Sequence, residues 1–132
     1  MKKPAFVVDA SVAVAWLFAG QATPETDALL ARMQAGDVPA APLLLYWEVG
    51  NVLATRTRRG ALAEHDARAL WKAFHELEIT LDKNDYADAA ISLALRHRIT
   101  VYDAVYLACA QALAVPLMSR DQGLLRAGRE IG

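Results

Sequence analysis

The 132-residue sequence contains few of the groups on which common metal and nucleotide sites depend. Cys109 is the only cysteine, so an internal disulfide is impossible and a reducing compartment is compatible with the chain. The three histidines have no metal-ligand spacing, so no zinc site is expected. The chain also lacks a glycine-rich phosphate loop, a dinucleotide-binding fingerprint and a G-x-S-x-G motif. These absences argue against the dinucleotide-dependent, phosphate-loop and serine-hydrolase classes.

The chain has little net charge and no apolar run long enough to span a membrane. Its formal net charge is −1, so no overall electrostatic field indicates a nucleic-acid partner. Lys2 and Lys3 precede an apolar stretch at 5–18, which resembles a secretory signal. However, Asp9 lies in the middle of that stretch, where a charge is costly, and the stretch is too short for a bilayer. We therefore expect a cytoplasmic protein without a membrane segment.

Composition and the alternation of apolar segments indicate an α/β domain. Apolar residues make up 55% of the chain, which is enough for a core at this length, so we expect residues 1–132 to form a single domain. Strands that alternate with helices favour a three-layer α/β/α sandwich with a mostly parallel central sheet. The expected strands are 5–8, 38–41, 79–81 and 115–118. The expected helices are 9–18, 24–36, 42–59, 64–77, 84–95, 103–114 and 121–127.

Four acidic residues lie inside or beside apolar segments that are far apart in the chain. Burying a carboxylate is costly unless a partner or a metal compensates its charge. The sequence has no equally placed set of lysines or arginines, so a divalent cation is the natural compensation, and Mg²⁺ or Mn²⁺ suits oxygen ligands best. In open parallel sheets, ligand sites form at the carboxyl ends of the strands. The four acids are Asp9, Glu48, Asp103 and Asp121.

Glu48 is the most diagnostic of the four acids. An aspartate at a helix start is most often only a cap, so Asp9, Asp103 and Asp121 are individually weak indicators of a site. Glu48 instead lies about two turns inside its expected helix, among apolar residues on the same face. Asn51 lies one turn further on and could orient a carboxylate or a water.

Arginines flank the expected acidic site. Arg56, Arg58 and Arg59 cluster at the end of the helix that carries Glu48, and Arg120 adjoins Asp121. Two interpretations remain open: the cluster stabilises the carboxyl end of its helix, or these cations guide a phosphate backbone towards the acids.

Four short motifs, in order along the chain, resemble those of PIN domains. The correspondence runs from Phe6 to about Leu125, nearly the whole chain. The compact size most resembles the VapC-type toxins of bacterial and archaeal toxin–antitoxin pairs. The motifs are Val7-Val8-Asp9-Ala10-Ser11, Glu48 with Asn51, Tyr102-Asp103-Ala104 continuing into Tyr106-Leu107-Ala108, and Ser119-Arg120-Asp121.

The resemblance implies a metal-dependent ribonuclease that uses Mg²⁺, with Mn²⁺ as a substitute. It also implies inhibition by a cognate antitoxin protein, and usually a homodimer. Asp9, Glu48, Asp103 and Asp121 become the catalytic acids, with Asp9 and Asp103 as the direct metal ligands. By the same resemblance, supporting hydrogen bonds to water or RNA phosphate would come from Ser11, Asn51 and Ser119.

Two other functions remain open. The first is a phosphatase-like transferase with Asp9 as the nucleophile, although such enzymes commonly place a second aspartate two residues later, where Ser11 stands. The second is a PIN-like module that binds RNA or a protein without cutting. The complete acid set argues against this second alternative.

Overall fold

A four-stranded parallel sheet forms the centre of the fold. The computed structural model describes residues 2–131, with side chains described as far as residue 129. All strand pairs in this part of the chain are parallel, and the strand order is β3-β2-β1-β4, which confirms the predicted α/β class. The strands are β1 (Phe6–Val8), β2 (Pro39–Pro42), β3 (Thr80–Asp82) and β4 (Leu117–Met118).

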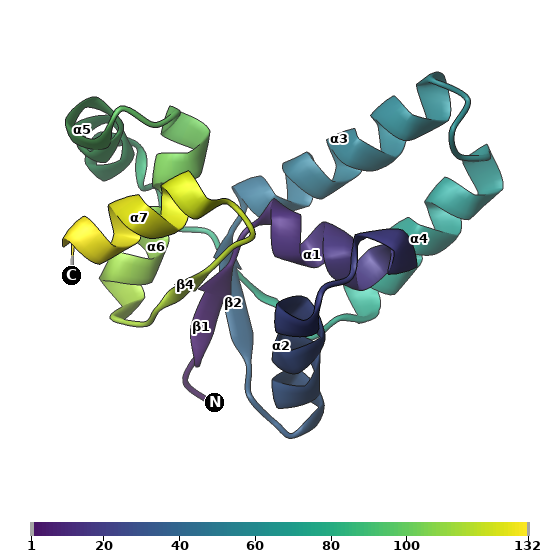
Figure 1. The fold of residues 1–132 in the computed structure, drawn as a ribbon, viewed down its shortest axis with the longest axis horizontal. Helices are drawn as coiled ribbons and strands as arrows, with labels where there is room; N and C mark the ends of the chain where they lie inside the picture. Colours follow the sequence, from purple (N-terminus) through teal and green to yellow (C-terminus); the bar gives the residue numbers. More distant parts are fainter. Residues whose placement is uncertain (1, 132) are drawn as a thin grey trace.

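Helices cover the sheet from both sides. In Figure 1, α1 and α2 lie on one side of β1 and β2, whereas α5, α6 and α7 lie on the other. The antiparallel pair α3 and α4 extends away from the sheet as an arm. The helices are α1 (Ala10–Leu17), α2 (Pro24–Gln34), α3 (Leu44–Arg58), α4 (Glu64–Glu76), α5 (Ala87–His97), α6 (Val101–Leu113) and α7 (Gln122–Ile131), with a 3-10 turn η1 at Ala19–Gln21.

The central strand follows directly from its sequence. Phe6, Val7 and Val8 are completely buried, as expected for a β-branched apolar run between two layers of helices. Val7 pairs with Ala40 of β2 on one side and with Leu117 of β4 on the other. The apolar stretch 5–18 thus divides into β1 and α1, and no helix within the described residues is long and apolar enough to cross a membrane.

Local capping decides several helix starts. Thr23 and Thr26 form a capping box at the start of α2, and Pro24 is its first residue, which matches the expected start at residue 24. The predicted start of α6 at Asp103 is wrong by two residues. Thr100 is the cap, and its hydroxyl accepts a hydrogen bond from the Asp103 backbone N–H at 3.0 Å. Asp103 therefore lies inside the first turn.

Other helix bounds also differ from the predictions. α3 begins at Leu44 rather than at residue 42, so Glu48 lies little more than one turn inside it. α5 begins at Ala87, and α7 continues to Ile131, beyond the predicted end at residue 127. Prolines and short polar segments bias a helix boundary without determining it, because backbone hydrogen bonding decides the final turn.

The strand order creates a natural place for a site. The chain moves from β1 outward through β2 to β3, and then returns to the other side of β1 to form β4. The loops that leave β1 and β4 therefore diverge at a topological switch point, where open parallel sheets form ligand sites. Figure 1 shows the loop between β4 and α7 beside the start of α1.

Candidate active site

Asp9 lies at the switch point and links β1 to β4. Its carboxylate accepts hydrogen bonds from the Ser11 hydroxyl at 2.6 Å, from the Val12 backbone N–H at 3.3 Å and from the Ser119 hydroxyl. The Asp9 residue is only 6% exposed. Burial raises the pKa of Asp9, and the hydrogen bonds from both serines oppose that change. Asp9 is therefore both the cap of α1 and a buried carboxylate at the centre of a network.

The loop after β4 completes this network. The Ser119 hydroxyl accepts a hydrogen bond from the Asp121 backbone N–H at 2.9 Å, and Ser11 accepts one from the Arg120 backbone N–H at 2.9 Å. Asp121 is exposed, and its carboxylate caps α7 by accepting from the Leu124 backbone N–H at 3.1 Å. The first and fourth sequence motifs are thus joined by two hydrogen bonds, from Ser119 to Asp9 and from Arg120 to Ser11, although about 110 residues separate them.

Glu48 and Asp103 reach the same site from two helices. Burial raises the pKa of Glu48, and the charges of Asp103 and Asp9 raise it further. Burial also raises the pKa of Asp103, with added contributions from the charges of Asp121 and Asp9. Since each acid interacts electrostatically with at least one other, the fold gathers the four predicted acids into one electronegative region.

The donor set of this region fits a hydrated divalent cation. None of the three salt bridges within the described residues includes any of the four acids, so no protein cation neutralises them. Within the same residues, no three acidic, histidine or cysteine side chains lie close enough together to hold a metal ion. Mg²⁺ commonly keeps several waters and uses only one or two carboxylates, so a Mg²⁺ site does not require three protein ligands.

Asn51 makes no hydrogen bond to this network within the described residues. Asn51 is exposed on α3, and its side chain makes no hydrogen bond within the described part of the chain. The Arg56 guanidinium lies 4.1 Å from the centre of the Phe18 ring, so a cation–π contact occupies one of the predicted basic residues. The Arg120 guanidinium donates to the Gln21 side chain at 3.2 Å and remains exposed at the rim of the site.

Sequence reasoning missed Tyr106. Its hydroxyl donates a hydrogen bond to Glu48 Oε1 at 2.5 Å, across 58 residues of sequence. A buried tyrosine needs a partner for its hydroxyl, and Tyr106 lies three residues after Asp103, on the same side of a helix. The three-residue spacing from Asp103 could have indicated that Tyr106 lies near the site, but it did not identify Glu48 as the hydrogen-bond partner.

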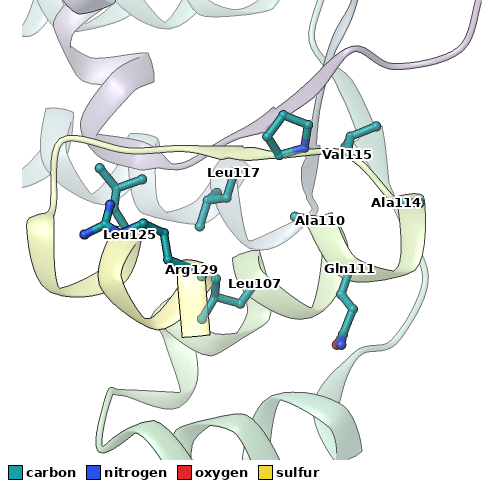
Figure 2. A pocket seen from close by; sticks show the side chains of 10 residues that line it. Leu107, Ala110, Gln111, Ala114, Val115, Leu117, Leu125 and Arg129 are labelled. Atoms are coloured by element: carbon teal, nitrogen blue, oxygen red, sulfur yellow. The ribbon is translucent and has the colours of Figure 1, made fainter. Parts of the chain in front are cut away.

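A cavity of about 700 Å³ lies away from the acids. Figure 2 shows it between α6, α7 and the approach to β4. Val115 and Pro116, which precede β4, line it, whereas Asp9 and Asp121 follow the opposite ends of β1 and β4. The cavity is therefore separate from the candidate active site. Its other lining residues include Leu107, Ala110, Leu117, Leu125 and Arg129.

The raised pKa values predict an unusual pH dependence of stability for the metal-free protein. Asp9, Glu48 and Asp103 each have a higher pKa in the folded chain than the ordinary value, so the folded state binds protons more tightly than the unfolded state. The free energy of unfolding should therefore rise as the pH is lowered from neutral towards the ordinary range of carboxyl groups. Urea unfolding in a chelator across this range measures it. A double variant, Asp9→Asn with Asp103→Asn, should show a flatter profile; a parental profile that falls with decreasing pH would contradict the assignment.

Comparison with known proteins identifies the family. The family model described as "PIN domain" matches residues 6–130, and this chain belongs to the PIN-domain family. Within that family it is similar to VapC proteins. Ribonuclease VapC3 of Pyrobaculum aerophilum is 38% identical over 125 residues, which cover 89% of this chain and 90% of that protein. Ribonuclease VapC1 of Mycobacterium tuberculosis is 38% identical over 91 residues, which cover 66% of this chain and 65% of that protein.

Solved structures share the fold. A crystal structure of a Pyrobaculum aerophilum protein has a TM-score of 0.75 at 22% identity, covering 96% of this chain and 87% of that one. A chain from a toxin–antitoxin complex of Klebsiella pneumoniae has a TM-score of 0.61 at 19% identity, covering 89% of this chain and 87% of that one. The predicted family and fold class are thereby confirmed.

Proposed function

We propose that this chain is a Mg²⁺-dependent endoribonuclease and the toxin of a toxin–antitoxin pair. The observation that carries the proposal is the convergence of four acids from separate elements, without a cationic partner, at the switch point of a PIN fold. The names of the relatives, Ribonuclease VapC3 and Ribonuclease VapC1, support RNA as the substrate.

The acids divide into two roles under this proposal. Asp9 and Asp103 hold the ion, with Mn²⁺ as a substitute for Mg²⁺. When bound, such an ion lowers the pKa of a coordinated water and stabilises charge on the scissile phosphate. Glu48 and Asp121, which both interact electrostatically with Asp103, would orient the attacking water, and one of the two would accept its proton.

The polar residues of the motifs position the acids. The Ser11 and Ser119 hydroxyls donate hydrogen bonds to Asp9. We therefore assign these serines the role of holding the Asp9 carboxylate in place and favouring its ionised form. Asn51 is exposed and remains available for an RNA phosphate. The three hydrogen bonds that Asp9 accepts, together with its burial, make it a poor nucleophile and disfavour the phosphatase alternative.

Protein partners follow from the same family membership. A solved neighbour of similar fold comes from a toxin–antitoxin complex, which supports a cognate antitoxin as the cytoplasmic partner of this chain. Large apolar side chains remain exposed, including Trp47 at 67% and Leu95 at 79%, and exposed apolar side chains are suited to protein interfaces. We assign these surfaces to the antitoxin and to a second copy of the chain in a homodimer.

Cleavage of RNA tests the function directly. With Mg²⁺, the parent protein should cut both linear and circular single-stranded RNA, because an endonuclease needs no free end, and should leave DNA of the same base sequence intact. Product sizes on denaturing gels measure this. Asp103→Asn should be inactive, and Asp88→Asn is the matched control, since Asp88 occupies the first turn of α5 and is exposed. RNA binding without any metal-dependent cleavage would instead favour the non-catalytic binding module.

A further inference from the structure

The hydrogen bond between Tyr106 and Glu48 joins two helices at the edge of the site. Tyr106 lies on α6 and is only 1% exposed, and Glu48 lies on α3 and is half-buried. The Tyr106 hydroxyl donates to Glu48 Oε1 at 2.5 Å. Within the described residues, this is the single hydrogen bond that the Glu48 carboxylate accepts, so it alone selects one orientation of that group.

A purely structural role does not require this hydroxyl. A phenylalanine would fill the same core volume, because the rest of the Tyr106 ring is enclosed by apolar residues. A buried hydroxyl without a partner is costly, so its placement beside Glu48 couples the core to the acidic site. Burial raises the pKa of the Tyr106 phenol, and the Glu48 charge adds to that effect, so the hydroxyl remains a donor over the working pH range.

We propose that Tyr106 is a positioning residue, which holds the Glu48 carboxylate in one rotamer and leaves Oε2 free to face the reacting water. A glutamate side chain has several rotatable bonds, and a fixed hydrogen bond removes conformers that point away from the site. Tyr106 then touches neither RNA nor the ion and acts only through Glu48. This inference rests on the proposed function for its catalytic consequence, but the orientation of Glu48 can be measured without activity.

The hydroxyl also favours the ionised form of Glu48. Burial and the charges of Asp103 and Asp9 raise the pKa of Glu48, whereas the hydrogen bond from Tyr106 lowers it. Removing the hydroxyl should therefore move the titration of Glu48 to higher pH. If Tyr106 only filled space in the core, removing its hydroxyl would leave the titration of Glu48 unchanged.

Tyr106→Phe is the test variant, and the chain offers a control in Tyr86, which makes the same kind of hydrogen bond but is only half-buried. Tyr86 also donates its hydroxyl to a carboxylate, that of Asp82, and its interactions involve Asp82, Asn84 and Cys109 rather than the four acids. Tyr86→Phe therefore removes the same kind of hydrogen bond outside the site. The thermal unfolding midpoints of the two variants allow their structural costs to be compared.

Two measurements on these variants decide the proposal. In Tyr106→Phe, kcat on a quencher-labelled random oligoribonucleotide should fall roughly ten-fold with little change in KM, the loss expected for one hydrogen bond to a charged group. In Tyr86→Phe, both constants should stay at the parental values. Carbon-13 NMR of the metal-free protein should show the Glu48 side-chain carboxyl resonance, assigned by its loss in Glu48→Gln, titrating at higher pH in Tyr106→Phe only.

The outcomes separate this inference from the function itself. A parent protein that cuts no RNA contradicts the proposed function, and the Glu48 titration still decides the role of Tyr106. An unchanged titration in Tyr106→Phe overturns the positioning role whatever the activity. Equal losses of kcat in Tyr106→Phe and Tyr86→Phe would also overturn it, because general destabilisation would then account for the effect.

Discussion

Replacing Asp9 by asparagine is expected to lower RNA cleavage by roughly a thousand-fold or more, while the protein stays folded. Asparagine can still accept from Ser11 and Val12, and its amide can donate to the Ser119 oxygen, so the network that joins β1 to β4 survives. The negative charge that would hold the ion is lost. Initial rates on a labelled oligoribonucleotide measure the effect, with Asp88→Asn as the control for an exposed aspartate.

The same substitution should stabilise the metal-free protein. Burial raises the pKa of Asp9, which shows that its ionised form is disfavoured in the folded chain. Removing this charge should raise the free energy of unfolding at neutral pH. Urea unfolding in a chelator measures the gain. Parental cleavage by Asp9→Asn would refute its role as a ligand, and a loss of stability would refute the electrostatic account of its burial.

Divalent metal is expected to have the second large effect, on both activity and stability. Chelation should abolish cleavage, and Mg²⁺ or Mn²⁺ should restore it. A ligand that binds only the folded state at one hundred times its dissociation constant stabilises that state by about 2.7 kcal/mol. For a domain of this size, that should raise the unfolding temperature by roughly 5–15 °C. Differential scanning calorimetry at fixed ionic strength, with K⁺ in place of the divalent ion, measures the specific effect.

Protons should compete with the metal in this experiment. Because Asp9 and Asp103 have raised pKa values without metal, lowering the pH neutralises them before ordinary carboxylates and weakens binding. The stabilisation should therefore shrink as the pH falls, and it should be absent from the double variant Asp9→Asn with Asp103→Asn. Equal stabilisation of the parent and the double variant would place the ion elsewhere on the molecule.

The strands and the acids were accessible to sequence reasoning because their signals are local. A β-branched apolar run such as 6–8 has few alternatives to a buried strand, and all four predicted strands are present in the sheet. The acids stood out because a carboxylate within an apolar segment is costly wherever that segment folds. Both inferences depend only on residues that are close together in the sequence.

Contacts between distant elements were not accessible in the same way. The partner of the Tyr106 hydroxyl lies 58 residues away, and nothing local in either helix specifies the pairing. Asn51, one turn after Glu48, is exposed, and its role in holding a water or an RNA phosphate stays a prediction. The start of α6 shifted because the Thr100 hydroxyl took the capping role.

The amino-acid order alone thus determined the class of the fold, the approximate strands and the identity of the four acids, since each depends on burial costs within a short segment. Only the tertiary structure decided which oxygen atoms meet. The return of β4 to the far side of β1 brings Ser119 to Asp9, and the docking of both α3 and α6 beside β2 brings Tyr106 to Glu48. These contacts depend on how whole elements dock, which no local pattern encodes.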